Sequence, residues 1–91
     1  MYLLEMRIRI YDSFSLKDKR KTVKGILDFG KNFNVSAAEV ADQDMLNLAG
    51  LAFVAVSSDN KVARSILEKI SIKIEQRYQV EILENHISRL G

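Results

Sequence analysis

Residues 12–24 read DSFSLKDKRKTVK, and this stretch marks where a strand gives way to a helix. Ser15 precedes an apolar run at helical spacing, and Asp18 follows three residues later, which is the capping-box pattern with Asp in place of the usual Glu. The Ser15 hydroxyl can therefore accept a hydrogen bond from a backbone N–H of the first turn. The spacing predicts a helix over about 16–31, ended by the Gly and Asn residues at 30–34.

This helix carries two separate stripes when its side chains are projected at roughly 100° per residue. The apolar stripe consists of Leu16, Val23, Ile26 and Leu27, with Phe33 at its edge. The basic stripe consists of Lys17, Arg20, Lys21, Lys24 and Lys31. Lys19 falls inside the apolar stripe, and we expect its side chain to snorkel over the rim of the core.

The start of the helix is suited to binding an anion. Free backbone N–H groups and the positive end of the helix dipole favour negative charge there, and the basic side chains lie within reach of the same end. The residues predicted to bind phosphate or RNA are Ser15, Lys17, Arg20, Lys21 and Lys24. The alternative interpretation is that the lysines only keep this helix face solvated.

The rest of the chain predicts three more strands and one more helix. Residues 2–11 alternate apolar and polar side chains, which indicates a half-buried strand. Residues 48–56 are apolar at both parities, which is typical of a central strand. The remaining elements are strands over about 35–41 and 79–87, and a helix from Ser57, Ser58 or Asp59 to about Arg77.

The element order βαββαβ predicts a single ferredoxin-like α+β domain over residues 1–91. Its four-stranded antiparallel sheet should carry both helices on one face, with the first and third strands in the centre. The predicted core is formed by Leu4, Met6, Ile8, Ile10, Val23, Ile26, Leu27, Ile66, Leu67, Ile70 and Ile74. This topology also places the connection at 42–47 beside the start of the first helix, so Lys17, Lys19 and Arg20 could instead pair with Asp42 and Asp44.

One apolar patch is expected on the open face of the sheet. If small Gly50 and Ala52 lie beneath the helices, Leu51 and Phe53 face away from them. An exposed apolar patch of this kind is typical of a protein–protein interface, and we expect a homodimer or larger homo-oligomer to bury it. The second functional hypothesis is therefore a homo-oligomeric interaction module that has no role with nucleic acid.

Composition limits the classes of function. The chain has no Cys, so disulfides, thiolate zinc sites and cysteine nucleophiles are excluded. No apolar run approaches the length of a membrane span, and we expect a cytoplasmic location. Residues 1–33 hold eight Lys or Arg against four Asp or Glu, whereas residues 34–91 hold six against eight. The positive charge is thus concentrated in the first third of the chain.

Other motifs argue for a non-catalytic protein. Residues 50–56 partly follow the strand-three pattern of RNA-recognition modules, but Leu51 replaces the first stacking aromatic. Glu39, Asp42 and Asp44 could ligate a hard cation, although pairing with nearby lysines is the more common use of such carboxylates. His86 is the only histidine, and we expect it on the surface of the last, edge strand without an acid–base partner. No catalytic residue, metal site or cofactor is predicted.

Three segments resemble a known family: SLKDKR at 15–20, FNVSAAEV at 33–40 and DQD at 42–44. They are similar to the YlxP-like family of small bacterial proteins, which is a domain of unknown function, and the resemblance covers nearly the whole chain. It implies a ferredoxin-like fold and no known catalytic residue. Members are often encoded among translation and ribosome-maturation genes, which implies an association with RNA or the ribosome. Ala41 departs from the pattern, because a polar or acidic residue is common there.

Overall fold

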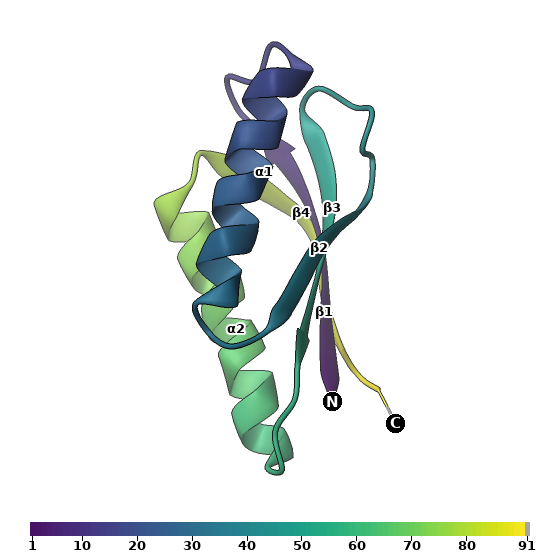
Figure 1. The fold of residues 1–91 in the computed structure, drawn as a ribbon, viewed down its shortest axis with the longest axis vertical. Helices are drawn as coiled ribbons and strands as arrows, with labels where there is room; N and C mark the ends of the chain where they lie inside the picture. Colours follow the sequence, from purple (N-terminus) through teal and green to yellow (C-terminus); the bar gives the residue numbers. More distant parts are fainter. Residues whose placement is uncertain (91) are drawn as a thin grey trace.

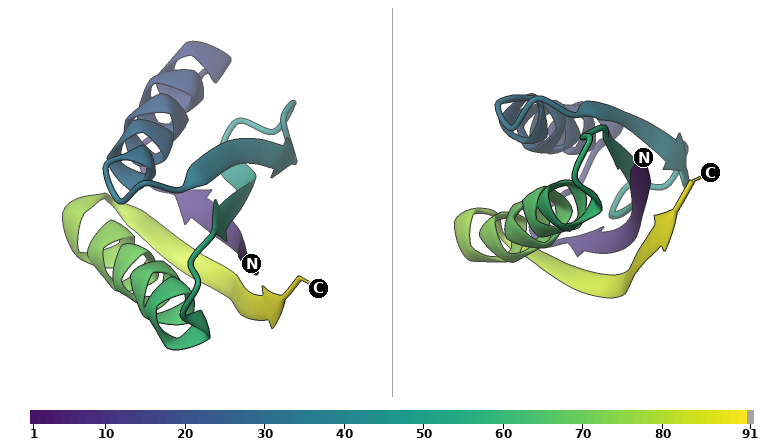
Figure 2. Two further views of the ribbon diagram at one scale, coloured as in Figure 1. Left: turned by 60° about the horizontal axis from the view of Figure 1, so that its bottom comes forward. Right: turned by 90° about the horizontal axis from the view of Figure 1, so that it is seen from below.

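Four strands and two helices make up residues 1–90, the part of the chain that the computed structural model describes. The elements are β1 (Tyr2–Ile10), α1 (Leu16–Lys31), β2 (Ser36–Ala41), β3 (Leu48–Ala55), α2 (Asn60–Arg77) and β4 (Val80–Arg89). The strands form one antiparallel sheet in the order β2-β3-β1-β4, and both helices cover the same face of it (Figures 1 and 2). This is the ferredoxin-like fold that the sequence predicts, with the first and third strands in the centre.

The helix boundaries agree with the capping signals. Ser15 is the N-cap of α1, and its Oγ accepts a hydrogen bond from the Asp18 N–H at 3.1 Å. Asp59 caps α2 by accepting from the Lys61 N–H at 2.9 Å. The last strand extends two residues beyond its predicted end, to Arg89, which pairs with Tyr2 at the start of β1, and a bulge lies in its middle. Neither helix in the described part of the chain combines the length and apolar character needed to cross a membrane.

The core lies between the sheet and the helices. The inward side chains of β1 meet those of both helices, as their periodicities of two and 3.6 residues predict. Nine of the predicted core residues are buried, and Leu27 and Ile66 are partly buried against them. Those nine are Leu4, Met6, Ile8, Ile10, Val23, Ile26, Leu67, Ile70 and Ile74.

The prediction for the two faces of β3 was wrong. Leu51 pairs with Met6 and Phe53 pairs with Leu4 in the antiparallel register, so all four side chains point toward the helices. Leu51 and Phe53 are both fully buried. Space for the Phe53 ring comes from Gly30 of α1, where an added Cβ would lie 2.5 Å from a ring carbon. Leu51 and Phe53 are therefore core residues, and they offer no surface to an oligomer interface or to a stacked base.

The open face of the sheet instead presents the small residues of β3. Gly50 and Ala52 pair with Arg7 and Glu5, whose side chains point away from the helices. At Gly50 the neighbouring strand comes very close, since an added Cβ would lie 2.6 Å from the Ala41 Cβ. This approach follows the bulge in β2. The centre of the open face consequently carries short side chains, and charged residues surround it.

Candidate functional site

Two hydrogen bonds of Asp18 hold the first turn of α1, but they form only half of the predicted capping box, because the carboxylate reaches the N–H of Phe14 rather than that of the N-cap residue Ser15. Asp18 donates its N–H to Ser15 Oγ, and Asp18 Oδ2 accepts from the Phe14 N–H at 3.4 Å. Within residues 1–90, the N–H groups of Leu16 and Lys17 have no acceptor. Ser15 therefore fixes the helix start, while the next two N–H groups keep the partial positive charge of the helix end.

Lys19 does not snorkel to solvent as the sequence analysis expected. Its side chain is 1 % exposed, and its Nζ lies 3.1 Å from Glu39 Oε2. The same Nζ donates to the backbone carbonyl of Asp42. Placing β2 beside α1 turns the Glu39 carboxylate inward, which gives the lysine an acceptor inside the molecule. One cation of the basic stretch is therefore used within the fold.

The predicted ion-pair cluster forms only in part. The Asp42 carboxylate accepts from Arg7 Nε at 2.9 Å, so its partner comes from β1 rather than from α1. Lys17 and Arg20 form no ion pair with any residue of 1–90, and neither does Asp44. Glu39 and Asp42, considered above as cation ligands, are each paired with a basic side chain.

The other predicted phosphate-binding side chains are exposed on the outer side of α1. Lys17, Arg20 and Lys21 are exposed and form no ion pair within the described residues. Lys24 is 80 % exposed and lies 3.3 Å from the Asp28 carboxylate, one turn further along. Exposed pairs of this kind contribute little to stability. All four of these predicted side chains are thus exposed, and among them only Lys24 has a carboxylate partner within the described residues.

A groove of about 270 Å³ runs between α1 and β2, and three basic side chains line it. Arg20 and Lys24 belong to the predicted set, whereas Lys31 belongs to the basic stripe but was not predicted to bind. Its position seven residues after Lys24 was the available signal, because that spacing repeats the same helix side. Glu39 also lines the groove, but Lys19 neutralises it, which leaves Asp28 as the one carboxylate opposing three cations among the described lining residues.

Four exposed apolar side chains that the sequence did not indicate lie in the two loops beside the start of α1. They are Tyr11 and Phe14 from the β1–α1 loop and Met45 and Leu46 from the β2–β3 loop. The two loops reach the same end of the sheet (Figure 1). They are joined by a hydrogen bond of 2.6 Å from Ser13 Oγ to the Leu46 carbonyl.

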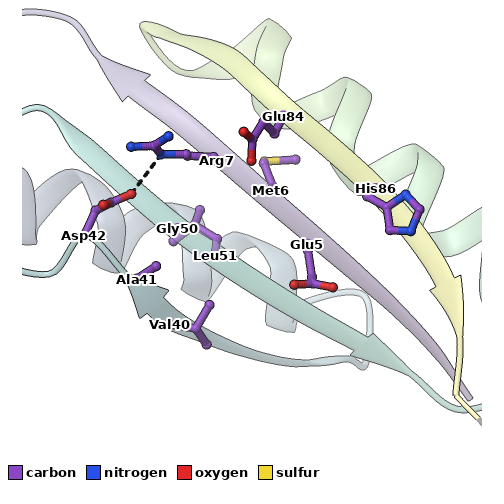
Figure 3. Close-up of a pocket in the computed structure, with 10 residues that line it drawn as sticks. All are labelled: Glu5, Met6, Arg7, Val40, Ala41, Asp42, Gly50, Leu51, Glu84 and His86. Carbon is purple, nitrogen blue, oxygen red and sulfur yellow. Dashed lines mark hydrogen bonds and ion pairs between the residues drawn. The ribbon is translucent and has the colours of Figure 1, made fainter.

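A second hollow, of about 470 Å³, lies on the open face of the sheet (Figure 3). The Arg7–Asp42 ion pair closes one end of it, and Gly50 lies in its floor. His86 is exposed on edge strand β4, as predicted, and its cross-strand neighbour in the register is Glu5. The lining mixes both signs of charge, so it has no electrostatic preference for phosphate.

Comparison with known proteins places the chain in a family. The family model described as "Protein of unknown function (DUF503)" matches residues 1–87. The chain belongs to the DUF503 family. "Uncharacterized protein YlxP" of Bacillus subtilis (strain 168) is 36 % identical over 73 residues, which cover 79 % of each chain. The predicted resemblance to YlxP-like proteins is therefore confirmed.

A solved structure also shares the fold of this DUF503 protein. The structural genomics protein YJCS covers 99 % of this chain and 98 % of its own, with a TM-score of 0.55 and 10 % sequence identity. At that identity the similarity concerns the fold alone. The function must therefore be argued from the side chains described above.

Proposed function

We propose that this DUF503 protein is a non-catalytic module that binds RNA, ribosomal RNA in particular, through α1. The observation that carries the proposal is the outer side of that helix, where five exposed cations face one exposed carboxylate, Asp28. Basic side chains are exposed there at Lys17, Arg20, Lys21, Lys24 and Lys31, and four of the five form no ion pair within residues 1–90. Lys19, the remaining cation of the stretch, is not part of this surface.

The dimensions of the surface suit a phosphate backbone. Lys17 and Lys31 lie fourteen residues apart on α1, which corresponds to about 21 Å of helix. A row of cations of that length can contact several successive phosphates of one strand. Such contacts supply affinity and position but little sequence preference, so binding should be sequence-tolerant and steeply dependent on salt.

A salt titration tests this proposal. We expect the variant Lys17→Ala, Arg20→Ala, Lys21→Ala to bind structured ribosomal RNA more weakly than the native protein. Each lost phosphate contact should flatten the slope of log affinity against log salt by about 0.7–0.9. The matched control is Lys61→Ala, Lys69→Ala, Lys73→Ala, which removes three exposed lysines from α2. Equal affinity and slope in the native protein and the α1 variant would contradict the proposal.

The second candidate function is a homo-oligomeric interaction module without a nucleic-acid role. It no longer depends on Leu51 and Phe53, which are buried. What favours it is the open sheet face, where the hollow is bordered by Val40, a side chain that is 57 % exposed. Light scattering at high micromolar concentration distinguishes the two candidates. If the protein is a monomer there and binds RNA, only the RNA-binding candidate remains.

A further inference from the structure

Phe14 is the most exposed large apolar side chain in the described part of the chain, with 80 % of its surface accessible. Single exposed apolar residues are common on protein surfaces, so exposure alone assigns nothing. Three features of its surroundings give this one a meaning: the missing partner, the fixed loop and the neighbouring charge.

The first feature is that Phe14 lacks the packing partner its position normally has. It stands directly before the N-cap, where an apolar residue usually packs against the fourth residue of the helix as a hydrophobic staple. In α1 that fourth residue is Lys19, whose side chain turns inward to Glu39. The staple is therefore absent, and the ring of Phe14 remains in water.

The second feature is that the loop carrying Phe14 is held in place from several sides. The Phe14 N–H donates to Asp18 Oδ2, and the preceding Ser13 Oγ donates to the Leu46 carbonyl. The Tyr11 N–H donates to the Gln79 carbonyl at 3.0 Å, which ties the start of the loop to the connection before β4. The ring is thus presented to solvent from an anchored loop, and little loop ordering would be needed for it to bind a partner.

The third feature is the charge beside the ring, where three exposed cations outnumber the exposed carboxylates of Asp12 and Asp18. Lys17 follows Phe14 by three residues, and Arg20 and Lys21 occupy the next turn, all exposed and without ion pairs within residues 1–90. Tyr11, half exposed, adds a second aromatic ring to the same loop. Aromatic side chains next to a track of cations are the combination that binds single-stranded nucleic acid, because the bases stack while the backbone follows the charge.

We propose that Phe14 is a stacking platform for an unpaired base, so that the ligand is RNA with a single-stranded segment rather than an uninterrupted duplex. The inference rests on the proposed function and specifies its ligand class. Duplex bases already stack on one another and offer no free face to the ring. In the proposed complex, phosphates of the bound strand contact the outer side of α1, and the base next to them lies on Phe14.

The experiment compares two RNA probes by fluorescence anisotropy at fixed salt. One probe is a single-stranded oligoribonucleotide of about 12 nucleotides, and the other is the same strand in a full duplex. Phe14→Ala should weaken binding of the single strand by about 10-fold to 100-fold. Its affinity for the duplex should stay within about 2-fold, and its salt slope should be unchanged because no phosphate contact is removed.

Three further variants make the result specific. Phe14→Trp should retain or exceed native affinity for the single strand, because it keeps a π-face. Phe14→Leu should behave like Phe14→Ala, since leucine is apolar but cannot stack. Val56→Ala is the matched control, because Val56 is 71 % exposed near the opposite end of the molecule, where β3 leads into α2 (Figure 1).

The outcomes separate this inference from the proposed function. If the native protein binds neither RNA at low salt, RNA binding itself fails. If it binds both RNAs through the α1 lysines but Phe14→Ala is unchanged on the single strand, only the stacking proposal fails. Native affinity in Phe14→Leu would indicate a generic apolar contact and overturn it. The same variants are also titrated against vesicles of anionic phospholipid. If Phe14→Ala weakens binding to the vesicles but not to the single strand, Phe14 belongs to a membrane-binding surface and the stacking proposal is overturned.

Discussion

The inner and outer sides of helix α1 use the same residue type in opposite ways. On the inner side, Lys19 is enclosed between the helix and β2, and its charge is matched by Glu39 and a backbone carbonyl. On the outer side, Lys17 and Lys21 are exposed and unpaired within the described residues. Lys17 and Lys19 are separated by a single residue of the helix, yet only the outer lysine is accessible to a binding partner.

The difference shows that the charge of a sequence stretch differs from the charge that the folded surface presents. An inward lysine is tolerated because a carboxylate from another strand neutralises it. An outward lysine is tolerated because water solvates it, and it remains available for a polyanion. Whether a charged residue in such a stretch is available for binding therefore depends on the helix side it occupies and on the strand that packs beside it.

The largest change in the free energy of unfolding is expected from replacing the inner lysine, Lys19. Lys19→Met should lower the free energy of unfolding by about 2–4 kcal/mol, because Glu39 Oε2 is buried and has no other partner in residues 1–90. The matched variant Lys17→Met should change it by less than about 0.5 kcal/mol. Urea denaturation measures both values.

A second substitution separates lost pairing from lost packing. Adding Glu39→Gln to Lys19→Met removes the isolated carboxylate charge and should recover part of the loss. If Lys19→Met and Lys17→Met destabilise equally, the two sides of the helix do not differ in the way described.

The two glycines of α1 should show the next largest effect. Gly30→Ala places a Cβ 2.5 Å from the Phe53 ring and should destabilise by about 1–3 kcal/mol through overpacking. Gly25→Ala meets only the Tyr78 ring at 3.8 Å, an ordinary contact, and should stabilise by up to about 1 kcal/mol through helix propensity. Thermal unfolding of both variants measures the opposite signs. A stabilised Gly30→Ala would mean that Phe53 does not pack beneath α1.

These residues also show where sequence reasoning succeeds and where it stops. The bounds of α1 follow from local signals, namely the Ser15 cap and the apolar spacing, and the sheet order follows from connection rules. The face of Phe53 could not be predicted, because residues 48–56 are apolar at both parities. The face is set by the pairing of β3 with β1, which brings Phe53 to the side of Leu4, and Gly30 on α1 leaves room for the ring.

The candidate site could likewise be predicted only in part from the sequence. The exposure of Lys17, Arg20, Lys21 and Lys24 follows from helix phase alone. The burial of Lys19 depends on Glu39, whose position relative to α1 is set by the sheet.

Phe14 was missed for a related reason. Its position before the N-cap predicts a packed staple, and the staple fails only because the fourth helix residue is a buried lysine.

The smallest effect on stability, and the sharpest test of the outer side, concerns Asp28. This carboxylate pairs with Lys24 in an exposed i,i+4 geometry at 3.3 Å, so Asp28→Asn should change the free energy of unfolding by less than about 0.5 kcal/mol. If α1 binds phosphate as proposed, the same change removes the carboxylate that opposes Arg20, Lys24 and Lys31 in the groove. RNA affinity should then rise a few-fold at low salt, and the salt slope should steepen by up to about 0.9 as Lys24 becomes free to contact a phosphate.

Glu68→Gln is the matched control, because Glu68 forms the same kind of pair with Arg64 at 3.0 Å on α2. An equal gain in both variants would reduce the effect to net charge, whereas a gain confined to Asp28→Asn would locate the phosphate contacts on α1.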